Sequence, residues 1–339
     1  TRYKLVTGVQ TCALPILMSF HVKRVTDWDE LWQTFEECPF AYPVAGGTDI
    51  IPRVNQGIEK HEQFVCLEGL PDMRGVSFEA DGSVRIGALT KLVEISENEA
   101  LAQYGGLREA CSRVASPQIR NQATIGGNVL QENRCVYFNQ SVSWRRVDHC
   151  FKLGGDRCYQ YPKALGCMAL FQSDVAPVLI SYNAITEWKS PRGTRTALLS
   201  ELYKAAGRKA KEPDEILTGL VIPPVTGALH SAYVRKTIRA SIDFPLVSCA
   251  VSLGVEDQVI KTAKIVVGSA GVMPRNVNEA PVLLEGKTLK EAAGMCKELQ
   301  DAVTKKIAPF QDSRVDGPTR QALGRDALKR ALAQACEEV

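Results

Sequence analysis

Two short stretches with paired glycines, Ala45-Gly-Gly-Thr-Asp49 and Thr124-Ile-Gly-Gly-Asn128, decide how this chain is expected to fold. The first joins a strand-like run to a predicted helix, with Thr48 or Asp49 as its cap. Glycines at such a join permit positive φ angles and let backbone N–H groups approach an anion closely. A plain tight turn is the alternative at each place. Neither stretch is a G-x-G-x-x-G or Walker A sequence, so the pair suggests a phosphate-bearing cofactor without specifying it.

Hydrophobic periodicity outside these stretches predicts an α+β protein of two main parts. Pro223-Pro224 marks the boundary, which divides residues 18–224 from residues 225–339. Beyond it, strands followed by helices indicate a separate α+β domain. The expected strands cover 76–80, 83–88, 178–180, 185–188, 216–222, 231–236, 247–255 and 259–268, and the expected helices cover 90–103, 106–115, 288–306 and 318–336.

Composition excludes several classes of protein. The chain has 339 residues, of which 45% are apolar and 23% charged, as in an ordinary globular protein with a full core. A net charge of +3 gives no reason to expect nucleic acid or an anionic membrane as a partner. No apolar run approaches the roughly 20 residues of a membrane span. Eleven cysteines, an odd count in a chain this long, fit a reducing compartment, so we expect the cytoplasm.

The first residues look foreign to the rest of the chain. Residues 1–17 resemble translated adapter sequence and are followed by Met18, so we interpret them as a non-native leader. A genuine N-terminal strand is the alternative.

Four cysteines cluster in the middle of the sequence, at Cys135, Cys150, Cys158 and Cys167. Clustered thiols suggest a metal, but this spacing matches neither zinc knuckles nor bacterial ferredoxins. Buried structural thiols are the alternative, as expected for most of the other cysteines. Nearby cations would lower the thiol pKa values and favour a thiolate-ligated cluster, and aromatic side chains would form a dry shell around it. The cations are Arg134, Arg145, Arg146, Lys152, Arg157 and Lys163; the aromatic residues are Tyr137, Phe138, Trp144, Phe151, Tyr159 and Tyr161.

The two glycine stretches, together with Ser173-Asp-Val-Ala-Pro177 and Asp243-Phe-Pro245, resemble the FAD-binding subunits of the molybdenum hydroxylase family. The resemblance covers about residues 20–336. It implies an FAD-binding fold of two α+β subdomains followed by a small C-terminal α+β domain.

The resemblance also implies a set of cofactor-binding residues. One side of the FAD pyrophosphate would be wrapped by Ala45, Gly46, Gly47, Thr48, Asp49 and Ile50, and the other side held by Thr124, Gly126, Gly127 and Asn128. Asp174 would hydrogen-bond the cofactor and Leu217 would pack against its rings. Arg235 stands where the family usually has a lysine, so the cation near the flavin is left open.

A long insertion, at about residues 132–170, narrows the resemblance. Asn133-Arg-Cys135, Phe138-Asn-Gln-Ser141 and Gly155-Asp-Arg-Cys158 are similar to the β subunit of the 4-hydroxybenzoyl-CoA reductase branch, which carries an extra [4Fe-4S] cluster. By this resemblance Cys135, Cys150, Cys158 and Cys167 would hold that cluster. The first cysteine gap is about one residue shorter than is usual there. A zinc site or a vestigial loop is the alternative.

The implied role is electron transfer within an oxidoreductase complex, with no catalytic acid, base or nucleophile on this chain. A ferredoxin would reduce the cluster, and electrons would pass to FAD, to a [2Fe-2S] small subunit, and to a molybdopterin-containing large subunit that dehydroxylates 4-hydroxybenzoyl-CoA. A dimer of heterotrimers is implied. Two alternatives are the equivalent subunit of a hydroxylase acting on a heterocycle or aldehyde, and an assembly subunit that has lost a cofactor.

Overall fold

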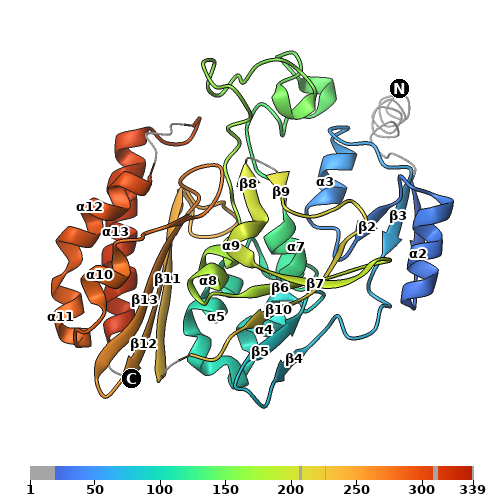
Figure 1. The fold of residues 1–339 in the computed structure, drawn as a ribbon. Coiled ribbons are helices and arrows are strands. Elements are labelled where there is room, and N and C mark those ends of the chain that lie inside the picture. Colours follow the sequence, from blue (N-terminus) through green and yellow to red (C-terminus); the bar gives the residue numbers. More distant parts are fainter. Residues whose placement is uncertain (1–19, 206–207, 226, 308–311, 338–339) are drawn as a thin grey trace, which may run out of the picture.

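The computed structural model describes residues 20–205, 208–225, 227–307 and 312–337. The predicted leader, residues 1–17, lies outside these ranges. The described chain forms three layered regions in sequence order, each built on its own sheet (Figure 1). This mixture of sheets and packed helices confirms the α+β prediction.

The first region is a small parallel sheet in the order β1-β3-β2, with β1 at His21–Arg24, β2 at Tyr42–Val44 and β3 at Gln63–Cys66. Helix α2 (Trp28–Glu37) begins after Asp27, whose side chain accepts from the Glu30 N–H at 2.8 Å. Helix α3 (Ile50–Asn55) follows the first glycine loop, as expected from the strand-loop-helix pattern.

The second region is a five-stranded antiparallel sheet in the order β4-β5-β10-β6-β7. The predicted hairpin at 76–88 is confirmed as β4 and β5. The strands are β4 (Val76–Phe78), β5 (Val84–Gly87), β6 (Ile185–Ser190), β7 (Gly193–Leu198) and β10 (Ile216–Ile222), with a two-stranded ribbon of β8 (Tyr203–Ala205) and β9 (Arg208–Lys209). The helices are α4 (Leu92–Glu97), η2 (Glu99–Tyr104), α5 (Gly105–Arg113), α6 (Pro117–Arg120), α7 (Ile125–Leu130), α8 (Val175–Ser181) and α9 (Leu199–Leu202).

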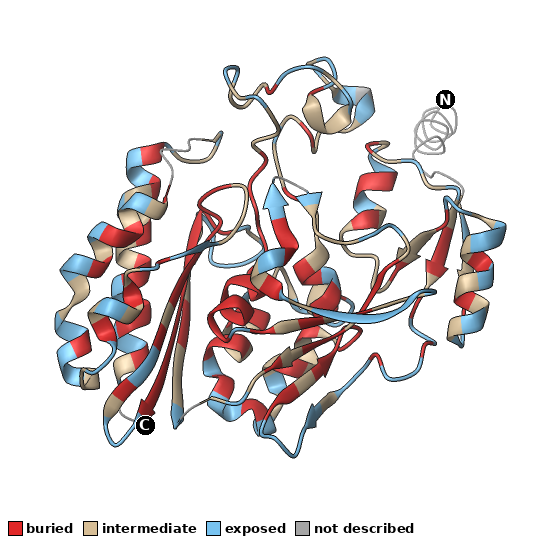
Figure 2. Cartoon of the chain, in the orientation of Figure 1, coloured by how far each residue is buried: buried red, intermediate tan, exposed pale blue. Residues whose placement is uncertain are grey.

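The third region is an antiparallel sheet, β11-β12-β13-β14, buried between two helical layers (Figures 1 and 2). One face packs on α5 and α8 of the second region, and the other is covered by the C-terminal helices. Alternate residues of one strand therefore enter different cores: Ala250 packs with the second region and Val251 with the C-terminal helices. The strands are β11 (Ala228–Lys236), β12 (Val247–Glu256), β13 (Val259–Gly268) and β14 (Arg275–Asn276); the helices are α10 (Ala280–Leu284), α11 (Leu289–Gly294), α12 (Cys296–Lys306) and α13 (Gly317–Cys336).

Three sequence-based assignments are wrong in detail. The helix expected over 90–103 is divided at Asn98, which is extended, into α4 and the 3₁₀ helix η2. The run at 178–180, expected as a strand, lies in helix α8, where every residue from Val175 to Ser181 is buried. A short apolar run buried on all sides has no periodicity that separates strand from helix. The helix expected over 288–306 is divided at Met295 into α11 and α12.

The segment between α7 and α8 projects from the body as irregular chain, drawn in green at the top of Figure 1. It contains two single-turn 3₁₀ helices, η3 (Val142–Trp144) and η4 (Phe151–Leu153). Its ends meet in an isolated antiparallel bridge between Arg134 and Leu170, with both N–H···O distances at 2.8 Å. We call residues 135–169 the cysteine insertion. Among the described residues, no helix combines the length and apolarity needed to cross a membrane.

Candidate cofactor site and cysteine insertion

The two glycine loops face one cavity, of about 1720 Å³. Its size suits a ligand larger than a typical drug-sized molecule. Of the sequence-predicted cofactor residues, all but one line this cavity: Ala45, Gly46, Gly47, Thr48, Asp49, Ile50, Thr124, Gly126, Gly127, Asn128, Asp174 and Leu217. The exception is Arg235.

The first loop, between β2 and α3, has free hydrogen-bond donors. Within the described part of the chain, the backbone N–H groups of Gly46, Gly47, Thr48 and Asp49 donate to no protein acceptor. Gly47 has φ of +68°, a conformation that side-chain-bearing residues rarely adopt. Unpaired N–H groups lining a cavity form a binding place for an anion, which fits the diphosphate of a dinucleotide.

The expected helix cap at Asp49 is not formed. Its carboxylate makes no capping bond to α3. Instead it accepts from the Arg53 and Arg134 guanidinium groups and from the Glu132 N–H at 3.1 Å. Asp49 therefore ties the first loop to the segment that leads into the cysteine insertion.

Gly46 is required by packing. A Cβ at this position would lie 1.9 Å from the Gln122 carbonyl oxygen. Since real Cβ atoms do not approach backbone so closely, only glycine lets the first loop lie against the turn before α7. The two loops are thus brought together by direct backbone contact.

The second loop forms the start of α7, and four of its five N–H groups are already used. The N–H groups of Ile125, Gly126 and Asn128 donate to backbone oxygens of the protein at 2.9–3.0 Å, and that of Gly127 donates to the Thr124 hydroxyl at 3.1 Å. Within the described residues only the Thr124 N–H of this loop donates to no protein acceptor, so the loop mainly shapes the cavity wall. The two glycine stretches, which look alike in sequence, thus offer a ligand different chemistry.

Asn128 and Asp174 are held by neighbouring groups at the cavity wall. The Asn128 carboxamide oxygen accepts from the Ser173 hydroxyl at 2.6 Å. The Asp174 carboxylate accepts from the Tyr233 hydroxyl at 2.7 Å and from Arg235 at 3.1 and 3.2 Å. Burial raises the pKa of Asp174, and the positive charge of Arg235 opposes that rise.

Arg235, the one predicted cofactor residue outside the cavity lining, is buried. Only 7% of its side chain is exposed. It forms a buried ion pair with Asp174 and does not line the cavity. It lies on β11, opposite Ser248 of β12, so the pair joins the third region to the cavity wall.

The four cysteines of the insertion lie in one neighbourhood. Cys150 and Cys158 are buried, and Cys135 and Cys167 are partly buried. Backbone N–H groups approach two of the sulfurs at 3.4 Å: that of Tyr161 at Cys158 and that of Ala169 at Cys167. Besides burial, the neighbouring thiols Cys158 and Cys167 raise the pKa of Cys135, and Cys150 and Cys158 raise that of Cys167.

The thiol pKa values differ from the sequence-based expectation. Burial raises the pKa values of Cys135 and Cys167, and the charge of Lys152 only partly offsets this at Cys167. Three of the other predicted cations have partners elsewhere: Arg134 pairs with Asp49, Arg145 donates to backbone oxygens of Tyr137 and Gln140, and Arg157 pairs with exposed Asp156. The predicted aromatic shell is also incomplete, because Trp144 is 80% exposed.

The thiols do not close into a ligand set. Over the ranges that the structure describes, no group of three or more His, Cys, Asp or Glu side chains is arranged to hold a metal ion. The fit of the cysteine insertion to a cluster is therefore partial: the thiols are gathered and shielded, but their sulfur atoms do not surround a common centre.

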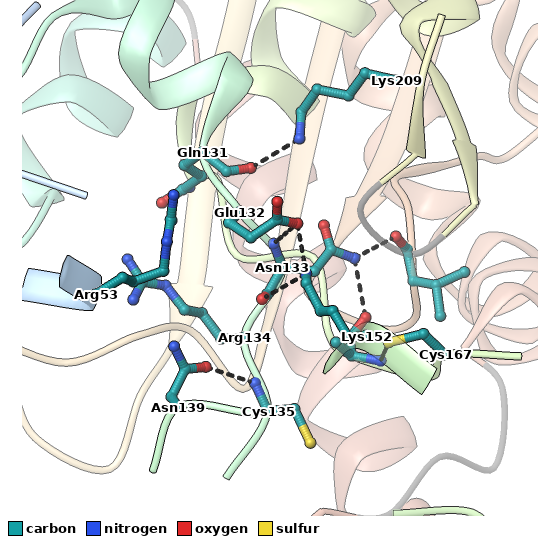
Figure 3. Close-up of polar contacts among 12 residues, drawn as sticks. Arg53, Gln131, Glu132, Asn133, Arg134, Cys135, Asn139, Lys152, Cys167 and Lys209 are labelled. Atoms are coloured by element: carbon teal, nitrogen blue, oxygen red, sulfur yellow. Dashed lines mark hydrogen bonds and ion pairs between the residues drawn. The ribbon is translucent and has the colours of Figure 1, made fainter. Parts of the chain in front are cut away.

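Sequence reasoning missed several charged residues at the cavity, shown in Figure 3. Glu132, Arg134 and Lys209 line it, and burial lowers the pKa of Lys209. Arg53 lies four residues after Asp49, a spacing that could have predicted their ion pair. Nothing in the sequence around Lys209 indicates that β9 reaches the cavity.

Comparisons with known proteins agree with this geometry. Residues 18–225 match the family described as FAD binding domain in molybdopterin dehydrogenase, and residues 232–335 match the CO dehydrogenase flavoprotein C-terminal domain. The aldehyde oxidoreductase FAD-binding subunit PaoB of Escherichia coli (strain K12) is 31% identical over 247 residues, covering 69% of this chain and 77% of that relative. The xanthine dehydrogenase FAD-binding subunit of Escherichia coli O157:H7 is 24% identical over 299 residues, covering 88% and 89%.

Solved structures share the fold. Quinoline 2-oxidoreductase from Pseudomonas putida 86 matches with a TM-score of 0.75 at 18% identity, covering 94% of this chain and 97% of that chain. Reconstituted CO dehydrogenase from Oligotropha carboxidovorans matches with a TM-score of 0.75 at 24% identity, covering 94% and 98%. The chain therefore belongs to the family of FAD-binding subunits of molybdenum hydroxylases, which includes the xanthine dehydrogenase FAD subunits and the CO dehydrogenase medium chains.

Proposed function

We propose that this chain relays electrons between FAD and a [4Fe-4S] cluster, as one subunit of a molybdenum-containing reductase. The observation that carries the proposal is the direct connection between a cavity with free N–H donors and an insertion that gathers four thiols. Residues 18–224, with the insertion at about 132–170, would form the FAD-binding part, and residues 225–339 the C-terminal domain.

In this proposal the first loop holds the FAD diphosphate. Gly46, Gly47, Thr48 and Asp49 would donate backbone hydrogen bonds, and Ala45 and Ile50 would complete the turn. Gly126 and Gly127 of the second loop would contact the diphosphate. The NH₂ group of the Asn128 carboxamide would donate a hydrogen bond to it. Leu217, which is buried at a bulge in β10, would pack against the rings. Asp174, oriented by Tyr233 and Arg235, would accept a hydrogen bond from the cofactor.

FAD exchanges electrons singly or in pairs, whereas an iron–sulfur cluster passes one at a time. Cys135, Cys150, Cys158 and Cys167 would hold the cluster after a rearrangement that brings their sulfur atoms together, since metal binding and local folding are coupled. Burial favours the neutral thiols, so cluster binding would release protons from Cys135 and Cys167.

The proposed substrate is based on the insertion alone. Its resemblance to the 4-hydroxybenzoyl-CoA reductase branch supports 4-hydroxybenzoyl-CoA, which takes up two electrons and two protons to give benzoyl-CoA and water. A ferredoxin would supply the electrons, and a [2Fe-2S] small subunit would pass them to a molybdopterin-containing large subunit in a dimer of heterotrimers. The described cysteines are free thiols, which fits a complex in the reducing cytoplasm.

A second function is favoured by the names of the relatives. They include subunits of xanthine dehydrogenase, aldehyde oxidoreductase and nicotinate dehydrogenase. The same FAD cavity would serve an enzyme that oxidises a heterocycle or an aldehyde, with electrons leaving through this subunit. Assays of the purified complex with 4-hydroxybenzoyl-CoA plus reductant, and with heterocycles or aldehydes plus an electron acceptor, separate the two.

The first experiment measures iron, acid-labile sulfide and flavin in the anaerobically purified complex, after isolation of this chain. About four irons, four sulfides and one FAD per chain are expected, because four thiols hold a [4Fe-4S] cluster. FAD without iron would contradict the cluster and leave the hydroxylase function. A colourless chain with neither would contradict both and support an assembly subunit.

A substitution tests the ligand set directly. Cys158→Ser should remove the cluster iron and its visible absorbance while FAD remains bound, because the thiol lies outside the cavity. Cys296→Ser, at the start of α12 in the C-terminal domain, is the matched control and should change neither content. Loss of flavin in the Cys158 variant would argue against separate sites.

A further inference from the structure

Five consecutive residues, Gln131 to Cys135, connect the cavity to the cysteine insertion, and successive residues contact different parts of the protein (Figure 3). The Gln131 carbonyl accepts from Lys209 of β9 at 3.1 Å. The Asn133 side chain donates to the carbonyls of Ala169 and Val272 at 2.9 and 2.8 Å, which fixes this segment to the end of the insertion and to the third region. We call residues 131–135 the connecting segment.

Arg134 joins the connecting segment to the first glycine loop. Its guanidinium pairs with the Asp49 carboxylate, which also accepts from the Glu132 N–H. The guanidinium lies 5.1 Å from the centre of the Phe244 ring, and both residues line the cavity. Asp49 belongs to the loop whose free N–H groups face the cavity, so a change in that loop moves the partner of Arg134.

Glu132 joins the same segment to the insertion. Its carboxylate accepts from the Lys152 ammonium at 2.5 Å, and Lys152 also donates to the Asn133 carbonyl at 3.3 Å. Lys152 is 11% exposed and lies 4.6 Å from the centre of the buried Phe138 ring. Its charge acts on Cys167, so the Glu132–Lys152 pair reaches from the cavity lining to the neighbourhood of the thiols.

These ion pairs are partly withdrawn from water. A desolvated charge is costly when its partner moves away, so the arrangement of each pair is kept only while both ends stay in place. The Asp49–Arg134 pair contacts the loop proposed to hold the diphosphate, and the Glu132–Lys152 pair contacts the insertion. A ligand that fixes the loop would therefore also fix the insertion.

We propose that Glu132 and Arg134 are positioning residues that couple FAD binding in the cavity to the placement of the cysteine insertion. This inference rests on the proposed FAD site. Coupling between two places is reciprocal, so FAD protects the insertion from local opening and an ordered insertion tightens FAD binding by the same factor. Their function is to hold the two proposed cofactors in a fixed arrangement.

The test uses the full complex, freed of flavin and then titrated with FAD. Hydrogen–deuterium exchange in peptides from residues 136–167 should slow when FAD binds to the wild type. In Arg134→Gln and Glu132→Gln this FAD-dependent slowing should be lost, and FAD should bind roughly 5- to 50-fold more weakly, within the usual range of coupling between sites. Arg134→Lys keeps the charge and should restore part of both effects.

Matched controls remove ion pairs of the same kind elsewhere. Arg85→Gln and Glu187→Gln each break a partly buried pair between β5 and β6, whose two residues do not line the cavity. Both should bind FAD and protect the insertion as the wild type does. This comparison separates a positioning function from a general loss of stability.

The outcomes distinguish this inference from the proposed function. FAD binding with no change of exchange in residues 136–167 would overturn the coupling and leave the FAD site intact. Absence of FAD binding in the wild type would overturn the proposed function itself. If Arg134→Gln fails to fold, the wild-type exchange with and without FAD, together with Arg134→Lys, still decides the question.

Discussion

Asp174 lies at the cavity wall, and its carboxylate pairs with Tyr233 and Arg235 of the third region. Both side chains of the ion pair are nearly inaccessible to water, with 5% and 7% exposure. Such a pair adds little net stability over apolar residues, but removal of one partner leaves a buried charge uncompensated. The residue proposed to contact FAD thus depends on an arginine that does not line the cavity.

Arg235→Met should destabilise the full chain by about 3–5 kcal/mol at neutral pH. Without the arginine, burial raises the Asp174 pKa further, so the folded state holds a proton that the unfolded state releases. The free energy of unfolding therefore falls as pH rises between the unfolded and folded pKa values. Denaturant titrations at pH 5 and pH 8 check this. The double variant Asp174→Asn, Arg235→Met should lose the added pH dependence; an unchanged dependence would assign it to another group.

A substitution at Gly127 tests whether the second loop borders the FAD site, and it should have little effect on the core. A Cβ there would meet only the Thr124 hydroxyl, at 3.0 Å, and the residue faces the cavity. Gly127→Val should weaken FAD binding by at least tenfold, because its side chain occupies ligand space, with a smaller change in thermal midpoint. Gly294→Val, at an exposed position with no neighbour within 4 Å of the added Cβ, is the control. Wild-type flavin content in the Gly127 variant would exclude this loop from the FAD site.

At the scale of elements, Gly46 of the first loop lies against the backbone of Gln122, in the turn just before the second loop. Gly46→Ala would place a methyl group 1.9 Å from the Gln122 carbonyl oxygen, so the backbone must move. We expect a loss of about 3 kcal/mol in stability and loss of FAD binding together, measured by denaturant titration and flavin content. Gly294→Ala is the control. A stable Gly46 variant with full flavin would show that the loops need not touch.

The sequence predicted the elements that carry a clear periodicity and missed those that do not. The hairpin at 76–88, the long strands around 247–268 and the last helix were predictable, because alternation, an Asp-Gly turn or a helical stripe marks each one. Helix α8 was not predictable because its apolar residues are buried on every side.

For the candidate site, the paired glycines predicted which backbone segments meet at the cavity. Their sequences are too alike to show that the first loop keeps four free N–H groups while most of those in the second loop are paired, since that difference comes from contacts with Ala88, Thr90 and Thr124. The pairing of Arg134 with Asp49, which are 85 positions apart, depends on tertiary structure alone.

At the scale of the whole molecule, the third region shares a core with the second. Tyr233, Ala250 and Val266 of its sheet belong to the same buried cluster as the residues around the five-stranded sheet. Interfaces this apolar resemble a domain interior more than a contact between independent domains. The two regions should therefore depend on each other for stability.

Calorimetry of the full chain should accordingly give one cooperative unfolding transition, with a calorimetric enthalpy equal to the van't Hoff enthalpy. The expressed segment 227–339 should unfold at a much lower temperature than the full chain, because one face of its sheet would be exposed. Two separate transitions in the full chain would contradict a shared core.

The antiparallel bridge between Arg134 and Leu170 places the two ends of the cysteine insertion side by side. Segments whose ends are adjacent can be inserted at a surface connection without altering the host fold. Residues 135–169 could thus be inserted at a single site in a flavin subunit that has only a short link between its equivalents of α7 and α8. The insertion could therefore be transferred to another subunit by protein engineering. Because Glu132, the partner of Lys152, lies outside residues 135–169, the new host would have to supply a carboxylate for Lys152.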